Sequence, residues 1–297
     1  MRTSIRASTT ADRLARRRQI PLVLELLVAN RAAAVGASAL ILFVLAAAAA
    51  PLLTPYDPTA QTLSDALLSP SAEHLLGTDH LGRDVLTRLL YGARYSLFLG
   101  FGAVGIALLV GVPVGALSGY YGGWVDLITQ RVVDVILSFP GFLLALSLVA
   151  VLGVGLMNVI LSVGISSIPA FVRLVRASTL SLREQLFVEA ARSIGCRDER
   201  IISRHILPNT VAPIIVQATL GLGSAILVAA GLGFLGLGVQ EPTPEWGTML
   251  GEGRQYIFAA THVVTFPGLA IFVTVLAFNL VGDGLRDAID PRLRGTI

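Results

Sequence analysis

The sequence contains no lysine and a single cysteine, and only 14% of its 297 residues are charged. One cysteine, Cys196, excludes an internal disulfide and any metal cluster built from cysteines. Without lysine there is no glycine-rich phosphate loop followed by a lysine, so we expect the chain to bind neither ATP nor another cofactor itself. A hydrophobic content of 54% indicates a membrane protein rather than a soluble domain, and a formal net charge of +3 gives no reason to expect a nucleic-acid partner.

No group of side chains suggests catalysis or metal binding. The four histidines are scattered without the spacing of metal ligands: His74, His80, His205 and His262. Ser162 and Ser166 lie in an apolar stretch that offers no histidine or lysine as a base. We therefore expect a protein that is not an enzyme and holds no metal.

Long apolar stretches predict six membrane-spanning helices, because about 20 helical residues cross a hydrocarbon core of ~30 Å. The expected spans are residues 32–54, 97–118, 127–152, 156–172, 210–235 and 261–281. The first is interpreted as an uncleaved span, because its basic flank is too long and its apolar run too wide for a signal peptide. Pro140 is expected to kink the third span, and Gly111, Gly115 and Gly119 favour close helix packing.

These spans divide the chain into a tail (1–31), a first span (32–54), an extracytoplasmic loop (55–95), a core of five spans (96–285) and a second tail (286–297). Within the loop, Leu81 to Ser96 predicts an amphipathic helix near the outer face. Arginines number seven in the first tail and seven between residues 173 and 204, against four in the predicted outer loops. Such a bias places both tails in the cytoplasm. Arg131 and Asp134, three residues apart, are expected either to pair or to anchor a span end.

The polar stretch between the fourth and fifth spans, residues 173–208, predicts a helical elbow that faces water. Residues 182–194 favour a helix, and Gly195 supplies a helix stop. Asp198 is placed to begin a second helix. Pro208 either stops this second helix or begins the next one. From this pattern alone, a docking element and a solvated loop without a partner are equally compatible.

Three separated motifs carry a family resemblance. The elbow sequence Glu189-Ala-Ala191, Gly195 and Leu207-Pro208 resembles the EAA loop of ABC-importer permeases, with His205 where that pattern favours an aliphatic residue. Residues 77–84 (GTDHLGRD) and 238–247 (GVQEPTPEWG) narrow the resemblance to the C-type permeases of the dipeptide/oligopeptide/nickel importers. The resemblance extends from about residue 70 to residue 292.

This resemblance implies an all-α integral membrane protein with six transmembrane helices in the type I ABC-importer permease fold. The expected function is the permease subunit of an ATP-driven, binding-protein-dependent importer of di- and oligopeptides in the bacterial inner membrane. The implied partners are a homologous second permease, two cytoplasmic ABC ATPase subunits, an extracytoplasmic solute-binding protein and membrane lipid. The residues implied in ATPase coupling are Glu189, Ala190, Ala191, Gly195, Arg197, His205, Leu207 and Pro208.

Alternatives remain at two points. The same importer class carries nickel or glutathione-like solutes, whereas an ion-coupled secondary carrier would need ionisable residues that these spans nearly lack. The acidic and aromatic residues of the last outer loop could contact the binding protein at the translocation mouth or merely cap the fold: Glu241, Glu245 and Trp246.

Overall fold

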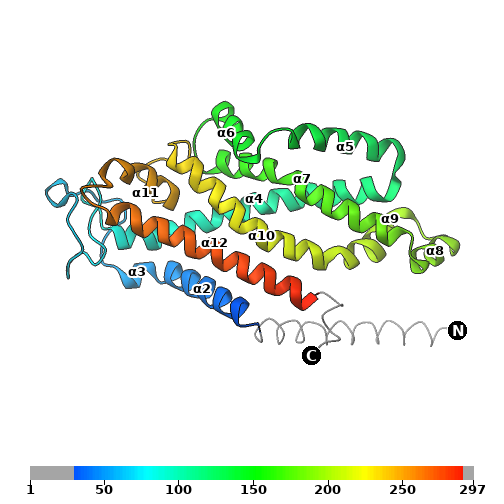
Figure 1. Ribbon diagram of the computed structural model, residues 1–297, viewed down its shortest axis with the longest axis horizontal. Coiled ribbons are helices and arrows are strands. Elements are labelled where there is room, and N and C mark those ends of the chain that lie inside the picture. Colours follow the sequence, from blue (N-terminus) through cyan, green and yellow to red (C-terminus); the bar gives the residue numbers. More distant parts are fainter. Residues whose placement is uncertain (1–29, 290–297) are drawn as a thin grey trace.

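Long apolar stretches fold into helices here, because inside a bilayer the backbone N–H and C=O groups have only one another as partners. The computed structural model describes residues 30–289, which contain helices and loops and no strand (Figure 1). The predicted tails, 1–31 and 286–297, lie mostly outside this range. The helices are α2 (Arg31–Ala48), α3 (Ala50–Leu53), η1 (Leu63–Asp65), α4 (Val85–Tyr121), α5 (Gly123–Leu137), α6 (Gly141–Leu152), α7 (Leu156–Arg183), α8 (Leu186–Ser193), α9 (Asp198–Ile201), η2 (Ile202–Ile206), α10 (Leu207–Phe234), α11 (Trp246–Gly253), η3 (Arg254–Tyr256) and α12 (His262–Ile289).

Five helical runs in the described chain are long and apolar enough to cross a membrane. They are α2, α4, α7, the run from Asp198 to Phe234, and α12. A sixth span results if α5 and α6 count as one, since they meet at an 86° bend next to Pro140. The count agrees with the six predicted spans, and the expected kink at Pro140 is a sharp bend.

The prediction of two separate helices between Leu81 and Ser118 was wrong. A single 37-residue helix, α4, begins at Val85, where the Asp84 carboxylate accepts a hydrogen bond from the Thr87 backbone N–H. Nothing in the following sequence breaks the helix, and Pro113 is accommodated inside it. The loop before it therefore covers residues 54–84 rather than 55–95. Similarly, α12 continues to Ile289, eight residues beyond the expected span end at residue 281.

The most extensive helix contact in the described chain is that of α4 with α7, and small residues allow the two backbones to approach closely. A Cβ added at Gly111 would lie 2.6 Å from the Phe171 Cβ, and one at Gly115 would lie 2.6 Å from the Val172 carbonyl oxygen. Gly119 meets the Arg176 carbonyl oxygen at 2.8 Å in the same way. The three glycines predicted from their spacing thus form the stripe on which α7 rests, as in other membrane helix pairs.

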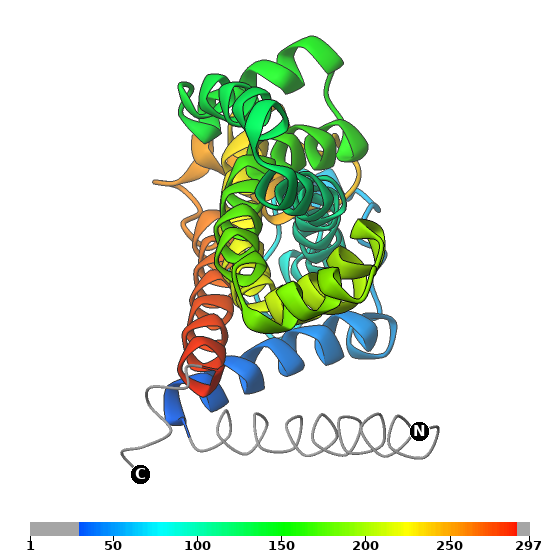
Figure 2. The same ribbon diagram turned by 90° about the vertical axis from the view of Figure 1, so that its right-hand side faces the viewer.

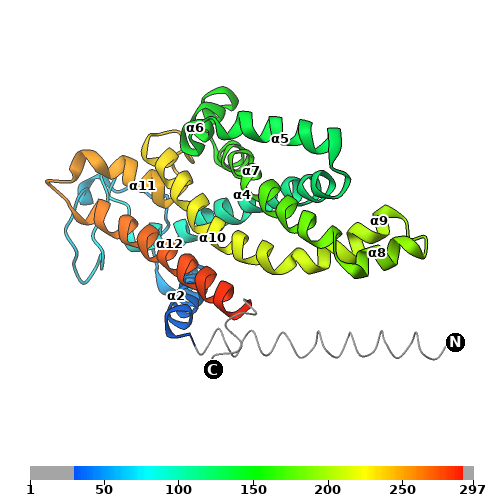
Figure 3. The same ribbon diagram turned by 45° about the vertical axis from the view of Figure 1, so that its right-hand side comes forward.

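The bundle has two different ends, which lie at opposite sides of Figure 1. One end carries α8 and α9, and we call residues 184–206 the elbow. The other carries α11 and residues 54–84, which we call the cap segment (Figure 3). An α-helix of 37 residues is about 55 Å long, more than a ~30 Å hydrocarbon core requires, so α4 extends beyond the membrane and reaches the elbow. In Figure 2, α2 and the α5–α6 pair lie on opposite edges of the bundle.

Candidate functional site

The elbow is built from two short helices joined at a glycine, but its first helix starts later than the sequence predicts. The single helix expected over residues 182–194 is interrupted, because α7 ends at Arg183 and Gln185 is extended (φ −81°, ψ 146°). The interruption turns α8 so that Val188 and Ala191 become buried against α4, α7 and η2. Apolar burial here overrides local helix propensity.

Gly195 ends α8 as predicted. Its φ of +76° lies in the left-handed region, which residues with a Cβ rarely adopt. Its N–H donates to the Arg192 carbonyl at 2.9 Å, and the Cys196 N–H donates to the Ala191 carbonyl at 3.0 Å, so the last carbonyls of α8 are satisfied. A Cβ at Gly195 would meet no atom within 4 Å, so glycine is required by backbone conformation rather than by space.

Pro208 opens α10 and does not stop the helix before it. The helical run continues from Asp198 to Phe234 through η2, a π-helical turn in which the Leu207 N–H donates to the Ile202 carbonyl. Proline has no N–H to donate, and the wider turn immediately before it accommodates that loss. Of the two outcomes left open by the sequence, the second is correct.

The structure separates the eight predicted coupling residues into two groups. Glu189, Ala190, Gly195 and Arg197 are exposed at the tip of the elbow, together with two apolar side chains, Leu186 (81% exposed) and Ile194 (80% exposed). The others are buried or half-buried and hold the elbow in place: Ala191, His205, Leu207 and Pro208. Exposed leucine and isoleucine next to a glutamate and an arginine are typical of a surface that a partner covers.

Tyr120, in the last turn of α4, anchors the elbow and was not singled out by the sequence pattern. Its side chain is buried, and its hydroxyl donates to Asp198 Oδ1 at 2.6 Å. The Arg192 guanidinium lies over its ring, with Cζ 5.2 Å from the ring centroid. The only sequence signal was an aromatic pair between glycines, Gly119-Tyr-Tyr-Gly122, which predicted nothing more specific than a turn.

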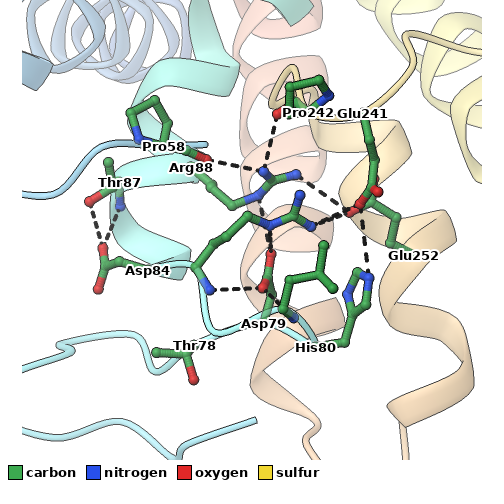
Figure 4. A network of polar contacts seen from close by, with 12 residues as sticks. Pro58, Thr78, Asp79, His80, Asp84, Thr87, Arg88, Glu241, Pro242 and Glu252 are labelled. Atoms are coloured by element: carbon green, nitrogen blue, oxygen red, sulfur yellow. Dashed lines mark hydrogen bonds and ion pairs between the residues drawn. The ribbon is translucent and has the colours of Figure 1, made fainter. Parts of the chain in front are cut away.

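At the opposite end, a buried ionic cluster joins the cap segment, α4 and α11 (Figure 4). Arg83 Nε donates to Asp79 Oδ2 at 2.6 Å, and Arg83 Nη2 donates to Glu241 Oε1 at 2.9 Å and to Glu252 Oε2 at 3.1 Å. Arg88 adds a contact of 3.4 Å to Glu252 and donates to the Pro58 and Pro242 carbonyls. Both guanidinium groups are almost fully buried, so they depend on these carboxylates and carbonyls for their hydrogen bonds.

Burial changes the acidity of this cluster. It raises the pKa of Glu252 to about 7, and the neighbouring Glu241 carboxylate adds to the rise while Arg88 and Arg83 oppose it. Burial also lowers the pKa of His80. The positive charge of Arg83 lowers this pKa further, whereas the negative charge of Asp79 raises it. Glu241 has a lowered pKa because its hydrogen bonds with Arg83 and Glu252 outweigh its partial burial. Near neutral pH, Glu252 therefore gains or loses a proton.

Three possible metal donors meet in this cluster although they are distant in sequence. Donor atoms of Asp79, His80 and Glu252 lie within 4.8 Å of one another. The Asp79 carboxylate is, however, already engaged by the Arg83 and Arg88 guanidinium groups, which would repel a cation. The donor set fits an ion-pair network better than a metal centre.

The structure bears on two alternatives that the sequence left open. Glu245 and Trp246 are buried (2% and 0% exposed) and cannot contact an outer partner in this conformation. The Glu245 carboxylate caps α11 and accepts a hydrogen bond from Ser96 Oγ, which supports the capping alternative for these two residues. Glu241 is about 42% exposed and remains available.

Of the two alternatives for Arg131 and Asp134, the pair between them does not form. Asp134 accepts instead from Arg173 Nη2 at 2.7 Å, and Asp126 accepts from Arg176 Nη2 at 2.6 Å. Asp126 and Asp134 are eight residues apart on α5 and share a face, so both turn toward α7. The two pairs tie α5 to α7.

Comparisons with known proteins agree with this architecture. The family model described as "Binding-protein-dependent transport system inner membrane component" matches residues 111–295, and that of the "N-terminal TM domain of oligopeptide transport permease C" matches residues 22–70. The chain is 52% identical over 265 residues to the "Dipeptide transport system permease protein DppC" of Alkalihalophilus pseudofirmus, covering 89% of this chain and 87% of that protein. It is also 52% identical over 256 residues to the "Glutathione transport system permease protein GsiD" of Escherichia coli, with 86% and 84% covered. Among solved structures, a chain of the inward-facing MetNI methionine ABC transporter superposes with a TM-score of 0.55 and 21% identity, covering 68% of this chain and 97% of that one, which shows a common fold.

Proposed function

The chain belongs to the binding-protein-dependent inner membrane transport components, as a C-type permease of a peptide-type ABC importer, and we propose that it imports a dipeptide or short oligopeptide. It is a multi-pass inner membrane subunit that depends on ATPase and solute-binding partners. We propose further that it pairs with one homologous permease and two cytoplasmic ATPase subunits. The dipeptide name of one relative supports the peptide assignment, and a second relative, equally identical, supports glutathione as the competing solute.

The exposed tip of the elbow carries the coupling proposal. It combines apolar side chains, a glutamate and an arginine on two short helices whose inner faces are fixed to α4 and α7. A partner ATPase that binds this tip can act on the bundle, because Val188, Ala191 and Ile201 are packed into the bundle. ATP-driven closure of the ATPases would thereby shift the spans between outward-facing and inward-facing states. The arginine excess of the elbow and its neighbouring residues supports a cytoplasmic elbow and cytoplasmic tails.

Reconstitution tests both the function and the coupling. The complex, purified with its co-expressed neighbouring subunits and placed in liposomes with its binding protein, should accumulate a radiolabelled dipeptide only when ATP can be hydrolysed. Glutathione is tested in parallel, and preferential uptake of glutathione would select the competing solute. Uptake without ATP would instead indicate a secondary carrier and overturn the proposal.

Charge reversal within the elbow tests the docking surface. Glu189→Lys should abolish uptake while leaving the amount of chain in the membrane unchanged, because it places a positive charge on the surface that we assign to the ATPase. Glu184→Lys is the matched control, since Glu184 is exposed and, within residues 30–289, forms an ion pair only with the adjacent Arg183, 2.8 Å away. Equal uptake by wild type and Glu189→Lys would remove Glu189 from the docking surface.

A further inference from the structure

The last turn of α4 is where all parts of the elbow meet the bundle. Tyr120 contacts Arg192 of α8 through its ring and Asp198 of α9 through its hydroxyl. From the end of α7, Arg183 Nη1 donates to the Gly119 carbonyl at 3.0 Å and to the Tyr120 carbonyl at 3.5 Å. One residue of α4 therefore touches both elbow helices as well as the helix that leads into them.

The Tyr120 hydrogen bond is special among the polar contacts of the elbow. Within residues 30–289, one hydrogen bond joins a side chain of the segment 186–206 to a side chain outside that segment, and it is the bond from Tyr120 to Asp198. The remaining side-chain hydrogen bonds of that segment are local, from Ser193, Ser203 and Asn209 to carbonyls four residues earlier. Apolar packing alone would allow α8 and α9 to slide, whereas a short hydrogen bond to a carboxylate fixes both position and direction.

The first elbow helix needs such an anchor because it is short. α8 has eight residues, and a helix of this length is not stable by itself, whereas α9 is the first turn of the continuous helical run from Asp198 to Phe234. The orientation of α8 is therefore imposed by what it contacts. Tyr120 contacts both α8 and α9 at their facing ends, on either side of the Gly195 turn, where the backbone is least restrained.

Tyr120 is also rigidly connected to the far end of the molecule. α4 runs without interruption from Val85, and Arg88 in its first turns belongs to the ionic cluster at the cap segment. Between them, the glycine stripe holds α4 against α7. The distance from Arg88 to Tyr120 along the helix is about 48 Å at 1.5 Å per residue. A displacement of the elbow that moves Tyr120 therefore moves α4, a single helix that extends to the ionic cluster at the other end of the bundle.

We propose that Tyr120 is a positioning residue that clamps both elbow helices to α4, so that movement of the ATPase-binding tip is transmitted to the spans. The proposal rests on the function proposed above. It assigns the transmission of movement to the hydroxyl bond with Asp198, and the alignment of α8 to the contact between the Tyr120 ring and Arg192. Loss of the hydroxyl should leave the fold and the assembled complex intact and should make ATP hydrolysis less productive.

The test uses the whole reconstituted complex and measures solute imported per ATP hydrolysed. Tyr120→Phe keeps the ring and removes the hydroxyl, and we expect this ratio to fall at least about threefold with unchanged recovery of the complex. Asp198→Ala should give a similar fall, and the double variant should be no worse than either single one, because both remove the same bond. Tyr121→Phe is the matched control, since the Tyr121 side chain is exposed next to Tyr120, and should keep the wild-type ratio.

If Tyr120→Phe imported as much solute per ATP hydrolysed as wild type, the proposal would be overturned. It would also be overturned if the fold-losses of Tyr120→Phe and Asp198→Ala multiplied in the double variant, because the two residues would then act independently. If Tyr120→Phe lowered only the recovery of the complex, with a normal ratio in what is recovered, the residue would be merely structural and the proposal would also fail. Failure of the proposed function is distinguishable, because it would appear as absence of ATP-dependent uptake in the wild-type complex itself.

Discussion

Arg83 and Glu252 form an ion pair, with Arg83 Nη2 3.1 Å from Glu252 Oε2, although one lies before the second span and the other shortly before the last. The same nitrogen also reaches Glu241 Oε1 at 2.9 Å, so two carboxylates share one buried donor. Two carboxylates in such a position do not ionise independently, because the charge of one raises the pKa of the other. The stability of this end of the bundle should therefore depend on pH.

The first prediction concerns that pH dependence. Burial and Glu241 raise the folded-state pKa of Glu252 to about 7, above its ordinary value of 4.5. Its contribution to stability is therefore complete below pH about 4.5 and is lost as pH rises through about 7, by on the order of 1–3 kcal/mol. Glu252→Gln imitates the protonated form, and its thermal stability in detergent should exceed that of wild type more at pH 8 than at pH 5.5.

The control for this experiment is Glu184→Gln, which removes an exposed glutamate at the opposite end and should keep the wild-type pH profile. Parallel profiles for Glu252→Gln and wild type would show that Glu252 does not titrate in this range. The groups that face Glu252 are Arg83, Arg88, Asp79, Glu241 and His80, so a shifted profile would be assigned to this cluster.

The second prediction separates buried from exposed arginine at the same end of the molecule. Arg83→Met leaves Asp79, Glu241 and Glu252 without their shared cation in a buried site, and it should destabilise the protein by about 3–5 kcal/mol. Arg254→Met makes the same substitution at an exposed residue whose guanidinium donates to the Phe234 carbonyl at 3.0 Å, and it should cost less than about 1 kcal/mol. Thermal unfolding of the purified chain measures both. Equal losses would mean that Arg83 is not the centre of the cluster.

The third prediction concerns the glycine stripe of α4. Gly115→Ala places a Cβ 2.6 Å from the Val172 carbonyl oxygen, so α4 and α7 must separate, at a cost of about 1–3 kcal/mol. Gly105→Ala lies on the same helix with open space around the added Cβ, and it should be neutral or stabilising by up to about 1 kcal/mol. We expect a lower melting temperature for Gly115→Ala and an unchanged or higher one for Gly105→Ala. A stable Gly115→Ala would contradict the close contact between the helices.

The sequence predicted the parts of this fold that depend on local pattern. Apolar run length placed the spans, and Gly195 predicted the turn of the elbow. The spacing of Gly111, Gly115 and Gly119 predicted close helix packing, and the structure shows that the partner is α7. The break between Arg183 and Leu186 could not be predicted in this way, because it results from burial of Val188 and Ala191 against distant helices.

The same reason explains the residues that sequence patterns missed. Asp79 and Glu252, or Tyr120 and Asp198, become neighbours only when the helices pack, and nothing in their local sequence marks them as partners. For Glu245 and Trp246 the sequence left a partner contact and a capping role open, and only the packed structure distinguishes them. An acidic and aromatic loop resembles a contact surface in the sequence. In the structure, Ser96 Oγ lies against it, where it donates to the Glu245 carboxylate and accepts from the Trp246 backbone N–H.

The last prediction tests the orientation of the bundle with the single cysteine. Cys196 follows the Gly195 turn at the elbow, and its half-buried thiol should react with a membrane-impermeant maleimide only from the cytoplasmic side. Inside-out vesicles should therefore label and intact cells should not, and binding of the ATPase subunits should slow the reaction. Phe258→Cys in a Cys196→Ser background reports on the other end, because Phe258 is 99% exposed between α11 and α12. It should show the reverse pattern, with full labelling of both variants after denaturation. Reaction of Cys196 in intact cells would invert the topology and place the elbow where no ATPase could reach it.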